Sequence, residues 1–473
     1  MHGVFLRLVL AVLLLVAAVA HAHHAAPQAV LRDANASGVI ATVSTGGVID
    51  PANPFFQSVG RNGRACVSCH DPAEGWTITP AGARARFETS EGLDPLFRTN
   101  DGSVSPRADV STVEARRSAY RLLLERGLIR VGLSVPADAE FSVDAIDDPY
   151  GYATASELSI FRRPLPTTNL RFGASIMWDG RELALDAQAD GAARDHALSA
   201  RPLTADERAR IVSLESGLYT AQISDNSAGA LDADGARGGP RSLTDQPFHP
   251  GINAGASADR AVFSLFTPWA NARGRLAPGR QAIARGEAIF NHRAFRPRGV
   301  SCSSCHDAPN AGSNSSGVFV SLGLSDAGLR TPDMPVYTLR CAKAGGVLRT
   351  TDPGRALVTG RCEDVGKFKV PTLRALAARV PYFHNGSAAT LEDVENRRIG
   401  SRRTGFLPQQ SACTTSPWST VTACFGSMVL RHTGQTGSSS RRTDAGAVRV
   451  TTSASSWVLT RANVWVNSAH RRH

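Results

Sequence analysis

Two short patterns of cysteine and histidine are the residues best suited to chemistry in this sequence. One is Cys66-Val67-Ser68-Cys69-His70, and the other, 236 residues further on, is Cys302-Ser303-Ser304-Cys305-His306. In a C-x-x-C-H pattern two thiols can form thioether bonds to a haem while the adjacent histidine ligates its iron. A C-x-x-C alone is equally compatible with a redox dithiol or half of a zinc site. The histidine in both copies favours two covalent c-type haems over a four-thiolate zinc site or paired structural cysteines.

Helices that lead into these two patterns would position them. The segment Asn53 to Phe56 ends ten residues before Cys66, and Ala284 to Phe290, which has helix formers and apolar spacing, ends twelve residues before Cys302. In c-type cytochromes a helix of this kind precedes the haem loop. The two halves of the chain are therefore predicted to be diverged copies of one plan.

The rest of the sequence predicts more helices and few strands. Residues 111–129, with a cap at Ser111-Thr112 and an end near Gly127, form one expected helix, and residues 205–219, capped by Thr204, form another. Residues 224–257 are rich in Gly, Asp, Ser, Ala and Pro, which indicates a domain junction or a long surface loop. We therefore expect a mainly α protein with two cytochrome c-like domains, each with one covalent haem, plus long irregular loops.

The start of the chain predicts export. Arg7 is followed by an unbroken apolar run of thirteen residues, Leu8 to Ala20, which is typical of a secretory signal peptide covering residues 1–22. Such a run is too short to cross a bilayer comfortably, so no membrane span is expected after cleavage; an uncleaved anchor is the alternative. The length of 473 residues accommodates two domains, an N-terminal one at 50–255 and a C-terminal one at 256–396.

The net charge of +11 is concentrated in the tail. Residues 397–473 hold eleven arginines, one acidic residue and no lysine, and so carry +10 of that charge. The body is nearly neutral and has no basic stripe, which predicts no nucleic-acid partner. The tail is rich in Ser, Thr and Arg without amphipathic period. It is either a disordered basic tail or an out-of-frame C-terminus.

Two further cysteines could pair with each other. Cys341 and Cys362 enclose a glycine-containing segment and could form a disulfide in an oxidising compartment. The alternative is two buried free thiols.

Several segments outside the cysteine patterns carry a family resemblance. They are Ala65 to Pro72, Met177 to Arg181, Phe368 to Arg374 and Pro381 to Glu392. In order and composition they resemble the bacterial di-haem cytochrome c peroxidases, a family that includes MauG of methylamine utilisation, over roughly residues 50–394.

The resemblance implies a periplasmic di-haem c-type peroxidase that reduces hydrogen peroxide to water. The peroxidatic haem would lie in the domain 50–255, and the domain 256–396 would carry the electron-transfer haem, supplied by a small cytochrome c or a cupredoxin. A homodimer is an open option. The alternatives are a MauG-like di-haem oxidase acting on a protein side chain, or a non-catalytic di-haem electron-transfer protein.

The resemblance also assigns roles to single residues. Trp178 would lie between the two haems and shorten the electron-tunnelling gap, or else be a plain core tryptophan. Arg181 would lie near haem propionates, or form a generic ion pair. His384 resembles a structural histidine of the family near the second haem.

The predicted acid/base residue departs from the family pattern. The family's distal glutamate falls at Leu198, which cannot transfer a proton. His196, with Asp195 beside it, is the nearest titratable substitute and suits proton delivery to peroxide. His196 could instead bind the iron or be a surface histidine.

Other family ligands are also replaced. The histidine that closes the resting site falls at Arg86, so the first haem is expected to be open. The calcium between the domains is possible but doubtful, because its asparagine aligns near Pro164. Its other protein contacts in the family, two backbone carbonyls, would map onto Arg379 and Pro381. The methionine or tyrosine on the second iron falls at Arg398, which cannot ligate, and Met428 is a remote substitute.

Overall fold

The computed structural model describes residues 30–246, 262–293, 301–342 and 346–396. The predicted signal peptide (1–22), the domain boundary at 255/256, Arg398, Met428 and the basic tail (397–473) lie outside the described residues. Among those that are described, no helix is both long and apolar enough to span a membrane.

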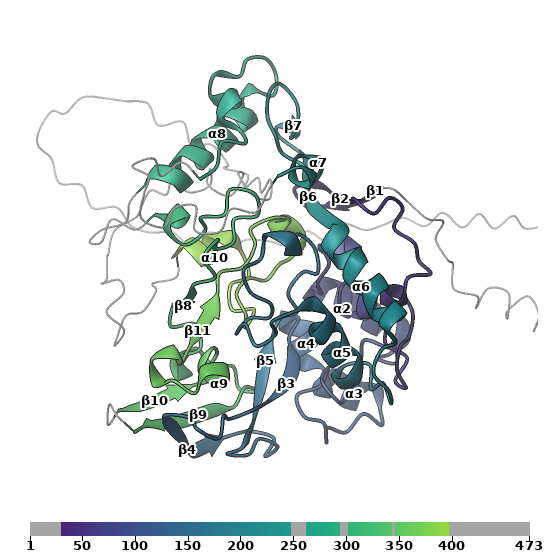
Figure 1. Ribbon diagram of the computed structural model, residues 1–473, viewed down its shortest axis with the longest axis vertical. Helices are drawn as coiled ribbons and strands as arrows, with labels where there is room; N and C mark the ends of the chain where they lie inside the picture. Colours follow the sequence, from purple (N-terminus) through teal and green to yellow (C-terminus); the bar gives the residue numbers. More distant parts are fainter. Residues whose placement is uncertain (1–29, 247–261, 294–300, 343–345, 397–473) are drawn as a thin grey trace, which may run out of the picture. The chain divides into compact units, whose positions relative to one another are not determined.

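The expectation of a mainly α protein is wrong. The described residues are 31% helical and 20% strand, and their strands form four sheets (Figure 1). The first sheet has the order β1-β2-β6-β7, with β1 (Val30–Asn35), β2 (Gly38–Ser44), β6 (Leu218–Asp225) and β7 (Gly229–Ala230). Its central pairing joins β2 to a strand more than 170 residues later, which no local sequence pattern reveals.

The other three sheets are smaller. β3 (Ile129–Ser134) pairs with β5 (Glu157–Arg162), and β8 (Phe319–Ser321) pairs with β11 (Lys367–Lys369). The fourth has the order β10-β9-β4, with β4 (Phe141–Asp147), β9 (Val336–Cys341) and β10 (Val347–Thr350). Figure 1 shows β4 alongside β9, so that a strand of the first half extends a sheet of the second.

The expected helices are present with different bounds. Thr112 caps the first as predicted, but the helix is interrupted at Tyr120, giving α3 (Val113–Ala119) and α4 (Arg121–Arg126), and it ends at Gly127, whose φ is 65°. The helix capped by Thr204 is α6 (Ala205–Gly217), which stops where β6 begins. The remaining helices are α2 (Pro80–Ser90), α5 (Leu185–Asp195), α7 (Arg241–Thr244), α8 (Ala277–His292), α9 (Ala356–Thr359) and α10 (Leu391–Asn396).

Each cysteine pattern packs on its own apolar cluster. Phe55, Trp76 and Leu214 are buried in the cluster that touches Cys66. Phe263, Trp269 and Phe290 belong to the cluster that touches Cys302. The segment before the first pattern is only a 3-10 turn, Pro54–Phe56, whereas α8 precedes the second.

The predicted disulfide is confirmed. Cys341, at the end of β9, is bonded to Cys362 in a 3-10 turn, Cys362–Asp364. The bond connects the β9–β10 hairpin to the segment that continues into β11.

Candidate active site

The two C-x-x-C-H patterns adopt the same local structure. Each begins with a 3-10 turn, Cys66–Ser68 and Cys302–Ser304. The backbone N–H of His70 donates to the carbonyl of Cys66 at 3.1 Å, and that of His306 donates to the carbonyl of Cys302 at 3.0 Å. In each turn a serine hydroxyl, of Ser68 or Ser304, accepts the N–H of the residue before the first cysteine. The two patterns are therefore alike in backbone structure as well as in sequence.

Both histidine rings are oriented in the same way. The Nδ1 of His70 donates to the carbonyl of Trp76 at 3.1 Å, and the Nδ1 of His306 donates to the carbonyl of Gly312 at 2.5 Å, in each case six residues on. A hydrogen bond from Nδ1 to a carbonyl leaves Nε2 to ligate a metal. Burial lowers the pKa of His70 to about 4, so its ring is neutral, which is the ligating form.

The four cysteines of the patterns fit haem attachment. None of them forms a disulfide, and burial raises the pKa of Cys66 and of Cys302 to about 12. Neutral thiols of this kind differ from the low-pKa thiolates of a redox dithiol. The described residues also contain no group of three or more Cys, His, Asp or Glu side chains that could hold a metal such as zinc.

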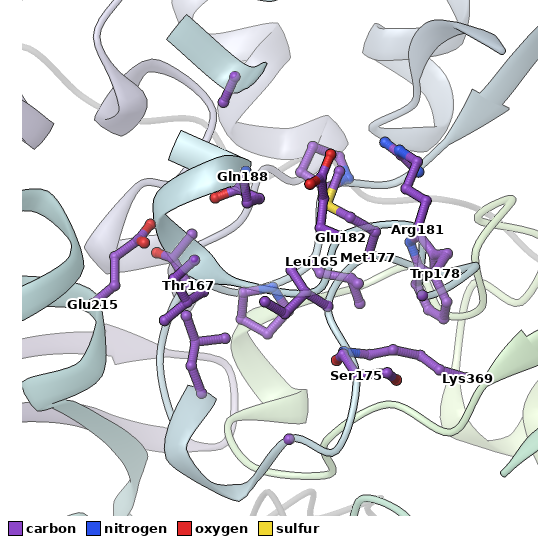
Figure 2. Close-up of a pocket in the computed structure, with 18 of the residues that line it drawn as sticks. Leu165, Thr167, Ser175, Met177, Trp178, Arg181, Glu182, Gln188, Glu215 and Lys369 are labelled. Atoms are coloured by element: carbon purple, nitrogen blue, oxygen red, sulfur yellow. The ribbon is translucent and has the colours of Figure 1, made fainter. Parts of the chain in front are cut away.

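A large cavity adjoins the first pattern. Its volume is about 650 Å³, which is within the usual range for a bound cofactor, and its wall is formed mainly by residues 162–197 (Figure 2). The wall brings together six predicted site residues, namely Cys66, Cys69, His70, Trp178, Arg181 and His196. Cys302, Cys305 and His306 are not part of this wall, although their loop contributes Ala311 and Ser313.

His196 lies at the end of α5 and is held by a partner that the sequence did not suggest. Its Nδ1 donates to the carboxylate of Asp101 at 2.6 Å, and its side chain is 29% exposed. Asp195, the expected neighbour, points outward and pairs with Arg194 on the exposed surface. Because Asp101 occupies Nδ1, the Nε2 atom is the ring nitrogen that remains for proton transfer.

Asp101 is a buried anion. Burial tends to raise its pKa, but the adjacent guanidinium of Arg64 and the bond from His196 hold the pKa below its usual range. Arg64 pairs with the second carboxylate oxygen and also donates to the backbone carbonyls of Pro95 and Leu96. Arg64, Asp101 and His196 therefore form one connected network that ends at the cavity.

Trp178 connects the cavity to the second half of the chain. Its Nε1 donates to the carbonyl of Arg163 at 2.7 Å, and its ring lies 6.2 Å from that of His384. His384 is buried and stacked on Phe368, with 3.8 Å between the ring centroids, and its Nε2 has no hydrogen-bond partner among the described residues. Trp178 is thus packed between segments of both halves.

Arg181 forms an ion pair at the cavity wall. Its Nη1 donates to both oxygens of Asp179, at 3.0 and 3.1 Å, and its side chain is 21% exposed. Asp179 also pairs with the buried Arg162, which makes a bidentate pair with Asp352. Arg181 therefore lines the cavity with a protein carboxylate as its partner, and its place near haem propionates stays a prediction.

Two charged residues of the wall escaped the sequence analysis. Glu215, on α6, is buried, and one of its carboxylate oxygens has no hydrogen-bond partner in the part of the chain that the structure describes; burial raises its pKa to about 8. Lys369, on β11, donates to the carbonyl of Ser175 at 2.7 Å, and burial lowers its pKa to about 8. Figure 2 shows them at different sides of the cavity. Lys369 lies in a segment that carried the resemblance, whereas nothing distinguished Glu215 from other helical glutamates.

Leu198 and Arg86, which stand where the family has its distal glutamate and its closing histidine, are not in the wall, whereas Pro164 is. Leu198 has a left-handed backbone, with φ 55°, and its carbonyl accepts the N–H of Arg61. Arg86, on α2, pairs with Asp94 and donates to the carbonyl of Ser68.

The two C-x-x-C-H turns and the cavity lined by His70 and His196 together have the features of a c-type haem protein with a reaction site. Comparisons with known proteins agree. The chain is 32% identical over 120 residues to the cytochrome-c peroxidase IdrP1 of Pseudomonas sp. strain SCT, and 37% identical over 97 residues to the cytochrome c551 peroxidase of Nitrosomonas europaea. These similarities confirm the resemblance to the bacterial di-haem cytochrome c peroxidase and MauG family.

The matched parts are short. The alignments cover 23% and 20% of this chain, and they span 29% and 23% of the length of the two relatives. No family model matches the chain. A solved MauG-like protein associated with microbial copper homeostasis is 16% identical, and the match covers 72% of this chain and 70% of that one with a TM-score of 0.34.

Proposed function

We propose that the chain is a periplasmic di-haem c-type peroxidase. It reduces hydrogen peroxide to two molecules of water, with two protons and with two electrons from a small cytochrome c or a cupredoxin. The observation that carries this proposal is the cavity that holds His70 and His196 together, with His196 fixed by Asp101. A haem bound to Cys66, Cys69 and His70 would supply the iron at which peroxide is reduced.

His196 is the proposed acid/base residue. The hydrogen bond to Asp101 fixes the ring and leaves Nε2 to accept and donate a proton at the cavity. A surface histidine would have no buried carboxylate as its partner. Proton transfer is therefore the role, of the three weighed from the sequence, that this arrangement supports best.

Trp178 and the second pattern supply the proposed electron path. Cys302, Cys305 and His306 would hold the second haem, and the Trp178 indole lies against His384, between the cavity and the second half. Arg181 is proposed to neutralise negative charge on the first haem's propionates, together with its role in the Asp179 pair.

The substrate, donor and location rest on the relatives and on the sequence. Both relatives are named cytochrome c peroxidases, which supports hydrogen peroxide as substrate and a redox protein as donor. The signal peptide predicted at residues 1–22 and the confirmed disulfide support an oxidising, exported environment.

Steady-state reduction of peroxide by the holoprotein, with a reduced small cytochrome c as donor, tests the proposal. His196→Gln should lower kcat by about 100-fold or more, because it removes the proton-transfer group. His292→Gln, at an exposed histidine on α8, should leave kcat unchanged. A protein that carries two haems but does not turn over peroxide would refute the peroxidase. A fully active His196→Gln variant would refute only the role of His196.

A further inference from the structure

Arg163 is a buried arginine that connects the two halves of the chain. Its Nη2 donates to the carbonyl of Ile78 at 2.7 Å, and its Nη1 donates to the carbonyl of Arg379 at 2.7 Å. Its backbone N–H donates to the carbonyl of His384, also at 2.7 Å. Arg163, which is 6% exposed, therefore hydrogen-bonds both to the segment after the first C-x-x-C-H turn and to the segment before α10.

The same residue fixes Trp178. The carbonyl of Arg163 accepts the Trp178 Nε1–H at 2.7 Å, and His384, which is bonded to the Arg163 backbone, packs its ring against the same indole. The position of Trp178 therefore depends on the position of Arg163.

Calcium does not fit at this place. The resemblance maps its protein ligands onto Pro164, Arg379 and Pro381, and calcium takes six to eight oxygen ligands. Pro164 has no side-chain oxygen, and its carbonyl already accepts the Thr77 hydroxyl at 2.6 Å. The carbonyl of Arg379 is occupied by the Arg163 guanidinium, whose positive charge would repel a second cation.

The charge of Arg163 persists at neutral pH. Burial, together with the nearby Arg379, lowers its pKa to about 9, which still leaves the guanidinium protonated at pH 7. A protonated guanidinium offers several donors in a fixed plane, so it can bind two carbonyls at once.

We propose that the Arg163 guanidinium takes the place of a metal ion between the two halves, so that this protein holds Trp178 in position without calcium. Arg163 is a positioning residue in this account. Its contacts are those of the chain itself and would hold Trp178 whichever reaction the cavity catalyses.

Calcium binding to the purified holoprotein gives the first test. After dialysis against a calcium-containing buffer and then a calcium-free one, elemental analysis should find no calcium in proportion to protein. The melting temperature should be the same in calcium chloride and in a calcium chelator. Stoichiometric calcium, or a melting temperature that falls in the chelator, would overturn the proposal.

Substitution of Arg163 gives the second test. Arg163→Gln removes the charge and at least one carbonyl bond, and should lower the melting temperature by about 5 °C. Hydrogen exchange of the peptides that contain residues 163–178 and 379–384 should become about tenfold faster, because their shared hydrogen bonds are lost.

Arg130→Gln is the matched control. Arg130 is also buried, at 8% exposed, and its guanidinium donates to the carbonyl of Asn100 and to the Ser159 hydroxyl rather than to Ile78 or Arg379. This variant should lose stability without faster exchange at residues 163–178. If both variants change exchange there equally, or if Arg163→Gln leaves it unchanged, Arg163 does not position Trp178. If Arg163→Gln does not fold, the calcium measurements on the wild-type protein still decide the proposal.

Discussion

His196 and Asp101 show how far sequence can reach at the scale of single residues. The sequence predicts His196 from its place relative to a missing glutamate, and it predicts the haem-binding residues from a contiguous pattern. The sequence shows only that Asp195 is adjacent to His196, and it does not reveal which carboxylate the ring contacts. Asp101 lies 95 residues away, in the loop between α2 and α3, and is brought to His196 by the tertiary structure.

Removing the charge of Asp101 should impair proton transfer without affecting peroxide binding. Asp101→Asn cannot supply the negative charge that holds the His196 ring with its proton on Nδ1, so kcat should fall about 10- to 100-fold. The KM for peroxide should stay within about twofold. Steady-state kinetics with a reduced small cytochrome c measure both constants.

The control for this change is Asp94→Asn, which breaks a carboxylate pair with Arg86 that is not part of the cavity wall. Its kcat should equal that of the wild type. Because Asp101 also pairs with the buried Arg64, melting curves must show that the Asp101 variant is folded at the assay temperature. A folded Asp101→Asn protein with wild-type kcat would refute a role for this carboxylate.

Glu215 should make the stability of the fold depend on pH. Its pKa is about 8 in the folded protein, against an ordinary value of 4.5, because burial disfavours the carboxylate. Between these two values the folded chain keeps a proton that the unfolded chain releases, so the free energy of unfolding falls as pH rises. Glu215→Gln has no carboxyl proton to lose, so its free energy of unfolding does not fall in this way. Relative to the wild type, the variant should therefore gain stability as pH rises, by about a few kcal/mol near pH 8.

Denaturant unfolding of both proteins, near pH 5 and near pH 8, measures this difference. Gln188→Ala, at an uncharged residue of the same wall, should change stability equally at both pH values. A Glu215→Gln variant whose advantage is the same at both pH values would show that Glu215 is ionised in the folded protein.

At the scale of elements, helices were predictable and most strands were not. The Thr112 and Thr204 caps and the apolar spacing before Cys302 are local signals, and each coincides with a helix start or a helix. The strands are short and pair across long separations, as β2 does with β6. The local pattern therefore extends the predicted helix over residues 205–219, whereas β6 begins at Leu218.

The disulfide is an element-scale feature whose contribution can be measured. Replacing both Cys341 and Cys362 by serine should lower the free energy of unfolding by about 3 kcal/mol, because the bond closes a loop with a sequence separation of 21 residues. Urea unfolding without reductant compares the two proteins. A thiol reductant should bring the wild type to the value of the double variant and leave that variant unaffected; a wild type insensitive to reductant would contradict the prediction.

At the scale of the whole molecule, the two motif copies should act independently in haem attachment. The exported chain should carry two covalent haems, and Cys66→Ala with Cys69→Ala, or Cys302→Ala with Cys305→Ala, should each remove one. Intact-mass spectrometry under denaturing conditions counts the haems. A wild-type chain whose mass shows fewer than two covalent haems would refute the prediction that both patterns attach haem. Loss of both haems from either variant would show that attachment at one pattern depends on the other.

The final prediction concerns whether the halves are separate folding units, as the predicted domains 50–255 and 256–396 would suggest. Several buried contacts cross between residues 30–246 and 262–396. β4 pairs with β9, and the Tyr337 hydroxyl bonds to both backbone groups of Ser159 at 2.8 Å. Arg162 and Asp352 form a buried bidentate ion pair, and losing one partner of such a pair typically costs about 3–5 kcal/mol.

Each half made alone would lose one side of every such contact. The fragment 262–396 would expose the edge of β9 and leave Asp352 without its guanidinium, and an uncovered strand edge promotes association. We expect that neither fragment, exported with its own haem, unfolds cooperatively in urea, and that the C-terminal one aggregates.

Co-expression of the two fragments should restore a soluble complex that unfolds in one transition. A control pair, cut in the loop at Asp232 within the first half, should reassociate less well, because the cut separates Ala228 and Leu231 from the rest of the apolar cluster that packs on α8. A C-terminal fragment that is monomeric and unfolds cooperatively would show that the halves are independent domains and that their shared sheet contributes little.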